Sequence, residues 1–128
     1  MKVHLDIDGA LARIRLDNPS KLNALTVEML AQLEAGCATL EQRPDIRTVL
    51  ITAEGERAFC AGADIKAWGA LSATEFARNW VREGHRVFDR LARLSIPTIA
   101  VIQAPAMGGG LELAGRTPRA RLSRAATP

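Results

Sequence analysis

Apolar and polar residues alternate along the start of the chain. The alternation is interrupted by Asp8-Gly9, a dipeptide that favours a tight turn, and Asn18-Pro19 follows its second half. Alternation with a period of two on both sides of a turn signal is typical of a β-hairpin. We therefore predict a hairpin whose apolar positions are Val3, Leu5, Ile7, Ala10, Ala12, Ile14 and Leu16.

Two later segments carry apolar residues at helical spacing. In the first, Thr26 is a candidate N-cap and Pro44 a stop; in the second, Ser72 and Glu75 have the spacing of a capping box, and Ile96-Pro97 breaks the pattern. The apolar face of the first predicted helix is Met29, Leu30, Leu33, Cys37 and Leu40. That of the second, which we expect to run to about Leu94, is Phe76, Trp80, Val87, Phe88, Leu91 and Leu94.

Short apolar runs flank the second predicted helix. Val49–Ile51 precedes it and Thr98–Ile102 follows it, and both predict buried strands. A strand, a crossover helix and a strand in one sheet give parallel strands. The carboxyl ends of the two strands should therefore lie at the same edge of the sheet.

A loop of small residues follows each of these strands. The first spans residues 59–66 (FCAGADIK) and the second residues 106–113 (AMGGGLEL), where Gly110 should begin a third helix. Small residues let main-chain amides approach a ligand closely, and two converging amides beside a helix N-terminus can stabilise an oxyanion. Taken singly, each loop is as well explained as an ordinary turn.

Composition and charge narrow the classes of function. The net charge is +3, but Arg116, Arg119, Arg121 and Arg124 lie in the last 13 residues, and the remainder carries 13 basic against 14 acidic residues. The body is therefore not a basic protein, and we expect no nucleic-acid partner. Cys37 and Cys60 have no metal-ligand spacing, and no apolar run is long enough to cross a membrane, so we expect a cytoplasmic protein without metal or membrane contact.

Four motifs in order resemble the enoyl-CoA hydratase/isomerase (crotonase) family. They are residues 19–25 (PSKLNAL), 61–66 (AGADIK), 96–100 (IPTIA) and 108–114 (GGGLELA). The resemblance covers residues 1 to about 114. It implies an α/β fold, the N-terminal part of a crotonase-like spiral of β-β-α units, with residues 1–114 as a partial domain.

The resemblance also implies which residues act on an acyl-CoA thioester. The amides of Ala63 and Gly109 match the pair that holds the thioester carbonyl and stabilises its enolate, and Glu112 matches the first catalytic glutamate. A glutamate in the first turn of a helix also suits the helix dipole, which leaves a purely structural role open. The matching coenzyme A contacts are Lys21, Leu22, Ala61, Asp64 and Ile65, with Lys66 near the phosphates or simply solvated. No separate cofactor is implied, since coenzyme A is part of the substrate.

The last residues depart from the family pattern. Residues 115–128 are dominated by Arg, Ala, Pro, Ser and Thr, which predicts a basic, disordered tail. A truncated or frameshifted end is our hypothesis, and a natural tail for an acidic partner is the alternative. Without the second glutamate and C-terminal helices of the family, which form its trimer-based oligomers, we expect no appreciable hydratase activity. A non-catalytic coenzyme A-binding fragment or interaction module is the competing function.

Overall fold

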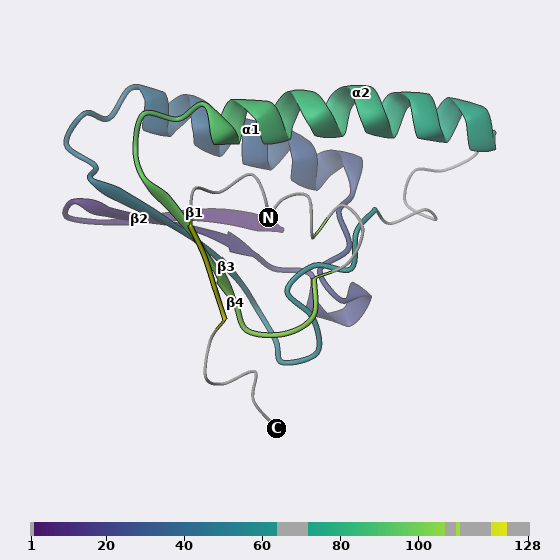
Figure 1. The fold of residues 1–128 in the computed structure, drawn as a ribbon, viewed down its shortest axis with the longest axis horizontal. Coiled ribbons are helices and arrows are strands. Elements are labelled where there is room, and N and C mark those ends of the chain that lie inside the picture. The colour runs from purple at the N-terminus through teal and green to yellow at the C-terminus, as the bar shows by residue number, and fades with distance from the viewer. Residues whose placement is uncertain (1, 64–71, 107–109, 111–118, 123–128) are drawn as a thin grey trace.

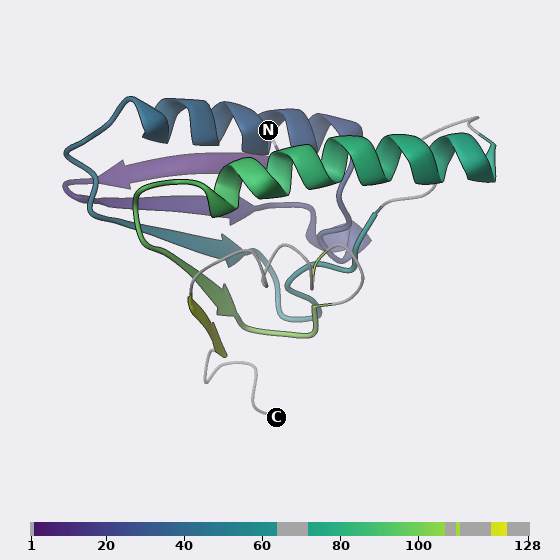
Figure 2. The same cartoon turned by 45° about the horizontal axis from the view of Figure 1, so that its top comes forward.

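The computed structural model describes residues 2–63, 72–106, 110 and 119–122. Its strands are β1 (Val3–Asp8), β2 (Leu11–Leu16), β3 (Thr48–Ala53), β4 (Thr98–Ile102) and β5 (Arg119–Leu122). Its helices are the 3-10 turn η1 (Pro19–Lys21), α1 (Val27–Glu41) and α2 (Ala73–Ala92). Figures 1 and 2 show one sheet with both α-helices lying on the same face of it.

The sheet has the order β1-β2-β3-β4-β5. The predicted hairpin is confirmed: β1 and β2 are antiparallel, with Asp8 opposite Leu11 and Gly9 at a φ of 60° in the turn between them. All other neighbours are parallel. The predicted parallel pairing of the strands on either side of α2 is therefore confirmed, and their carboxyl ends share one edge.

Both helices begin where the sequence predicts. The Thr26 side chain accepts a hydrogen bond from the Met29 amide at 3.0 Å, and Ser72 and Glu75 form the full capping box. These bonds satisfy main-chain donors that the first turn of a helix leaves without partners. Every residue of the predicted apolar face of α1 is buried.

The core lies between the helices and the sheet. Alternate residues of β2 and β3 point into it, and α2 contributes Val87, Phe88 and Leu91, each at most 1% exposed. Trp80 packs edge-on against Phe88 with ring centroids 6.2 Å apart, which fits a packing role. Ion pairs of Arg86 with Glu34 and of Arg90 with Glu41 join α2 to α1 at the surface.

The predicted disordered tail is wrong at Arg119–Leu122. These residues form β5, which pairs in parallel with β4. The segment alternates arginine with Ala120 and Leu122, a pattern too short to predict a strand by itself. The free main-chain groups of β4 supply the partner that composition cannot reveal. The rest of the tail lies outside the described residues.

Candidate functional site

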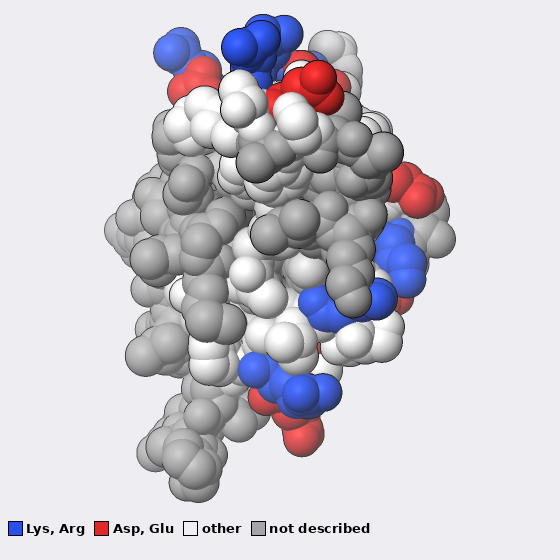
Figure 3. Space-filling model, turned by 90° about the vertical axis from the view of Figure 1, so that its right-hand side faces the viewer, with Lys and Arg blue, Asp and Glu red and all other residues white. Residues whose placement is uncertain are grey.

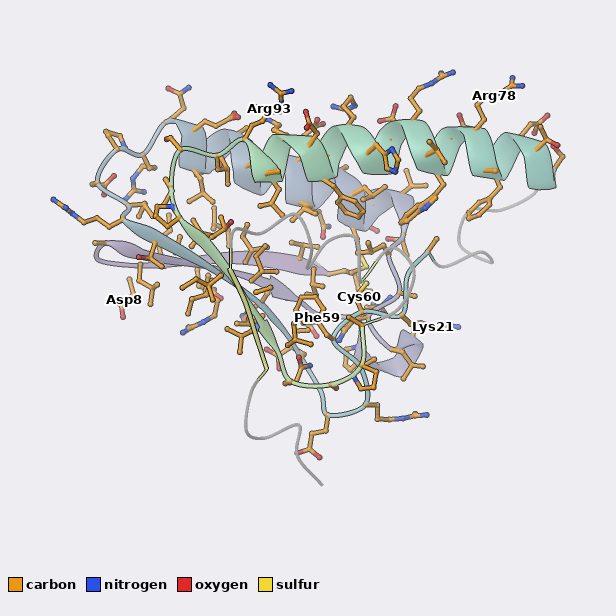
Figure 4. The ribbon with its side chains drawn as sticks, in the orientation of Figure 1. Asp8, Lys21, Phe59, Cys60, Arg78 and Arg93 are labelled. Carbon is orange, nitrogen blue, oxygen red and sulfur yellow. The ribbon has the colours of Figure 1, made fainter. Side chains whose placement is uncertain are left out.

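The candidate site lies at the carboxyl edge of the parallel strands. Two chain segments follow β3 and β4 there: residues 54–63 and residues 103–106, with Gly110 just beyond. A third segment, residues 18–25, precedes α1 and includes η1. Figure 4 shows Phe59 and Cys60 inside this end of the molecule, while the Lys21 side chain projects outward from it.

The first loop and the second loop are brought together. Cys60 and Ala106 form an isolated parallel bridge, and the Phe59 amide donates to the Pro105 carbonyl at 3.0 Å. Gly110 lies against the same residue: a Cβ atom added to it would come within 2.1 Å of the Cys60 carbonyl oxygen. Only glycine fits this contact, because the neighbouring atom belongs to the main chain.

The first loop is also joined to the segment before α1. The Ala61 amide donates to the Leu22 carbonyl at 3.0 Å, and the Leu25 amide donates to the Gly62 carbonyl at 2.6 Å. Leu25 and Ala63 form a parallel bridge. Residues 60–63 therefore run between the segment containing Leu22 and Leu25 and the segment containing Ala106.

This arrangement orients the Ala63 amide. A trans peptide group directs its C=O and its N–H to opposite sides. The Leu25 amide donates to the Gly62 carbonyl, which belongs to the same peptide group as the Ala63 N–H. The Ala63 N–H is therefore directed away from Leu25. This donor is thus not used by the segment before α1, while Ala106 and Gly110 contact the same loop three residues earlier, at Cys60.

The structure places four of the predicted site residues together. Lys21 is exposed at the end of η1, Leu22 follows it at a φ of 56°, and Ala61 and Ala63 lie beside this segment in the loop. The predicted Asp64, Ile65, Lys66, Gly109 and Glu112 lie outside the described residues. Figure 3 faces this end of the molecule and shows both basic and acidic side chains beside uncharged surface in its lower half.

Cys60 is a packing residue in this site. It is fully buried, and burial raises the pKa of its thiol from 9.0 to about 11. A thiol with a raised pKa carries almost no thiolate near neutral pH and is a poor nucleophile. This agrees with the absence of an activating histidine pattern in the sequence.

Two side chains of the site were not assigned a role from the sequence. Asn23, fully buried at a φ of 55°, donates to the carbonyls of Glu54 and Ala58, and Gln103 donates to those of Ala53, Gly55 and Ala58. Asn23 stood inside a family motif, and Gln103 is the first polar residue after a buried apolar strand. Both were visible, but nothing local shows what they reach.

Metal binding and membrane spanning find no support in this part of the chain. Within the described residues, no three His, Cys, Asp or Glu side chains gather as a metal site would require. None of the described helices is long and apolar enough to cross a membrane.

Comparisons of this sequence with a family model and with individual proteins indicate the same family. The sequence model for enoyl-CoA hydratase/isomerase matches residues 11–120, which extends past the limit of about 114 seen in the motifs. A probable mitochondrial enoyl-CoA hydratase 2 of Arabidopsis thaliana is 37% identical over 107 residues, covering 84% of this chain and 35% of that protein. A short-chain-enoyl-CoA hydratase of Clostridium acetobutylicum is 34% identical over 112 residues, covering 88% and 42%.

Solved structures agree with this fold. An enoyl-CoA hydratase from Bacillus anthracis superposes with a TM-score of 0.91 at 28% identity, covering 98% of this chain and 49% of that one. An enoyl-CoA hydratase from Mycobacterium smegmatis gives a TM-score of 0.89 at 30% identity, covering 97% and 48%. The chain thus spans about half the length of these structures and less than half of the relatives it matches in sequence.

Proposed function

Because the chain belongs to the enoyl-CoA hydratase/isomerase family, we propose that it binds acyl-CoA thioesters and polarises the thioester carbonyl at the carboxyl edge of β3 and β4. The observation that carries the proposal is the Cys60–Ala106 bridge with Gly110 packed on Cys60. It brings the two small-residue loops side by side, so that their amides can share one ligand atom.

The proposed carbonyl ligands are the main-chain amides of Ala63 and Gly109. The direction of the Ala63 N–H, away from Leu25 and the segment before α1, supports this assignment, because it leaves this donor for a ligand. Two donors already in place favour the charge that develops on the oxygen when the α-carbon loses a proton, because they need no rearrangement during the reaction. The result is an enolate held at the edge of the sheet.

The other proposed contacts surround this point. Leu22 and Ala61, joined by a main-chain hydrogen bond, would border the pantetheine arm, and Lys21 is exposed where a phosphate can reach it. Asp64, Ile65 and Lys66 complete the proposed coenzyme A contacts. Glu112 is the proposed base, because this glutamate, two residues after the glycine run, matches the first catalytic glutamate of the family.

The test is exchange of the α-protons of butyryl-CoA with deuterium oxide, followed by proton NMR. This reaction requires an oxyanion site and one base, so it examines the proposed chemistry without requiring a second carboxylate. We expect exchange above the buffer rate in the wild-type chain and loss of the excess in Glu112→Gln, which keeps the side-chain shape.

A parallel titration separates the competing functions. If butyryl-CoA binds, measured by calorimetry, but its α-protons do not exchange, the chain is a non-catalytic coenzyme A-binding module. If the chain neither binds butyryl-CoA nor exchanges its α-protons, the proposal is contradicted altogether.

A further inference from the structure

A side-chain amide holds the loop that presents Ala63. The Gln103 Nε2 atom lies 3.1 Å from the Ala53 carbonyl oxygen, 3.1 Å from that of Gly55 and 3.3 Å from that of Ala58. The three acceptors span the whole turn between the end of β3 and the small-residue loop. One side chain thus holds the main chain of a segment in which the long side chains of Glu56 and Arg57 are exposed to solvent.

A second side-chain amide, from the segment before α1, holds the same loop. Asn23 Nδ2 lies 2.9 Å from the Glu54 carbonyl oxygen and 3.0 Å from that of Ala58. Its Oδ1 accepts from the Asn18 amide at 2.8 Å, which fixes the orientation of the Asn23 side chain. The two amides therefore meet at Ala58, the residue that leads into Phe59 and Cys60.

The orientation of the Gln103 amide follows from its surroundings. Exchanging its nitrogen and oxygen would place Oε1 against three carbonyl oxygens, which repel it. In the present orientation Oε1 is buried and has no hydrogen-bond partner in the described part of the chain. A buried acceptor without a partner costs about 1–3 kcal/mol, so the nitrogen side, whose two hydrogens are shared among the three carbonyl oxygens, must offset this cost.

We propose that Gln103, together with Asn23, is a positioning residue that sets the Ala63 amide for the thioester carbonyl by holding residues 53–58. This inference rests on the proposed function for the identity of the ligand. It adds that the geometry of the oxyanion site depends on a side chain that touches neither substrate nor coenzyme A. Gln103 lies at the end of β4, so a rigid strand supports the loop of β3.

The variant that isolates this role is Gln103→Met, which keeps the length of the side chain and removes the donor. Gln32→Met is the matched control: Gln32 is also half-buried and also holds main chain, accepting at Oε1 from the amides of Lys2 and Val3. Both changes remove hydrogen bonds from one glutamine. Of the two glutamines, Gln103 is the one that bonds the loop of residues 53–58.

The first readout is amide hydrogen exchange in the ligand-free protein. In Gln103→Met we expect the Phe59 and Ala61 amides, which donate across the site, to exchange about tenfold faster, because local opening becomes easier. In Gln32→Met the faster exchange should be confined to Lys2 and Val3. Equal exchange of the loop amides in the two variants would overturn the proposal.

The second readout is the carbonyl chemical shift of bound butyryl-CoA labelled with ¹³C at the thioester carbon. We expect a downfield shift on binding to the wild type and to Gln32→Met, and a carbonyl nearer its free position in Gln103→Met at similar affinity. A change of affinity with an unaltered carbonyl shift would contradict a positioning role.

These readouts keep the two ideas apart. A wild-type chain that binds no acyl-CoA refutes the proposed function, while the exchange rates still decide whether Gln103 holds the loop. If the wild-type chain binds acyl-CoA and polarises its carbonyl, and Gln103→Met does the same, the proposed function stands and the positioning role is refuted.

Discussion

The two ends of the parallel strands β3 and β4 are built differently. At the amino end, the amides of Arg47 and Thr48 donate to the Ala10 carbonyl, and the Val49 amide donates to that of Pro97. The charged groups there face solvent, around a surface hollow of about 440 Å³ lined in part by Arg43, Arg47 and Ser95. The hydrogen bonds that join these segments at this end are between main-chain groups.

At the carboxyl end, the side-chain amides of buried Asn23 and half-buried Gln103 join the segments. Asn23 and Gln103 donate five hydrogen bonds to carbonyls of residues 53–58, and Gly110 packs on the main chain of Cys60. Polar groups buried with their partners fix one arrangement of a loop more narrowly than exposed ones do. We therefore expect the carboxyl end to depend on a few long-range contacts and the amino end to tolerate substitution.

The largest effect is expected at Gly110. In Gly110→Ala the new Cβ would lie within 2.1 Å of the Cys60 carbonyl oxygen, so the two loops must separate. Overpacking of this kind costs about 1–3 kcal/mol, and here the upper part of that range applies because main chain must move. Chemical denaturation measures the loss of unfolding free energy, and acyl-CoA affinity should fall with it.

Gly36→Ala is the control for this substitution. Gly36 lies inside α1, and a Cβ added there meets no atom within 4 Å. Alanine in a helix interior is favoured over glycine by about 1 kcal/mol, so this variant should be more stable than the wild type. Destabilisation of both variants alike would show that the close contact at Gly110 is not what matters.

A smaller effect should appear at high pH. Burial raises the pKa of Cys60 and that of Cys37 in α1, both from 9.0 to about 11. The folded protein therefore holds these protons between about pH 9 and 11 while the unfolded chain releases them, so stability is full below pH 9 and falls as the pH rises. Each pKa unit corresponds to about 1.4 kcal/mol.

Single variants separate the loss of stability due to Cys60, in the loop, from that due to Cys37, in α1. Cys60→Ala and Cys37→Ala should each reduce the decline of the unfolding free energy across this pH range by a similar amount, since both thiols are fully buried. If only Cys37→Ala has this effect, the loop around Cys60 is open to water, and the comparison between a closed carboxyl end and an exposed amino end is wrong.

The smallest effect is expected at the amino end. Arg43 forms a two-bonded ion pair with Asp45, but both residues are on the surface, where solvent screens the pair. Arg43→Ala should leave the thermal midpoint and acyl-CoA affinity unchanged within error, as measured by calorimetry. A clear loss of affinity would mean that the amino end contributes to the site.

What could be predicted from the sequence was local. The caps at Thr26 and Ser72, the hairpin and the strand Thr98–Ile102 are specified by neighbours within a few residues, and each is confirmed. The strand β5 was missed because it is stabilised by pairing with β4 and not by a pattern in its own sequence. The same reason hides Asn23 and Gln103, whose acceptors lie between 31 and 50 residues away along the chain.

The site itself was predictable only through motifs. Small residues after two parallel strands indicate where amides can approach a ligand, and the structure brings Lys21, Leu22, Ala61 and Ala63 to one edge as the motifs imply. Which amides face one another depends on loop conformation. That is set by distant side chains, so residue spacing alone could not predict it.

The most direct test of the account is an NMR titration of the isotope-labelled chain with crotonyl-CoA and, separately, with free coenzyme A. We predict that the amide protons of Ala63 and Gly109 move downfield with crotonyl-CoA only, because only the thioester supplies a carbonyl oxygen to accept from them. The amides of Leu22 and Ala61 should respond to both ligands. Identical shifts of Ala63 and Gly109 with the two ligands, or none with either, would contradict the assignment of these amides as the oxyanion site.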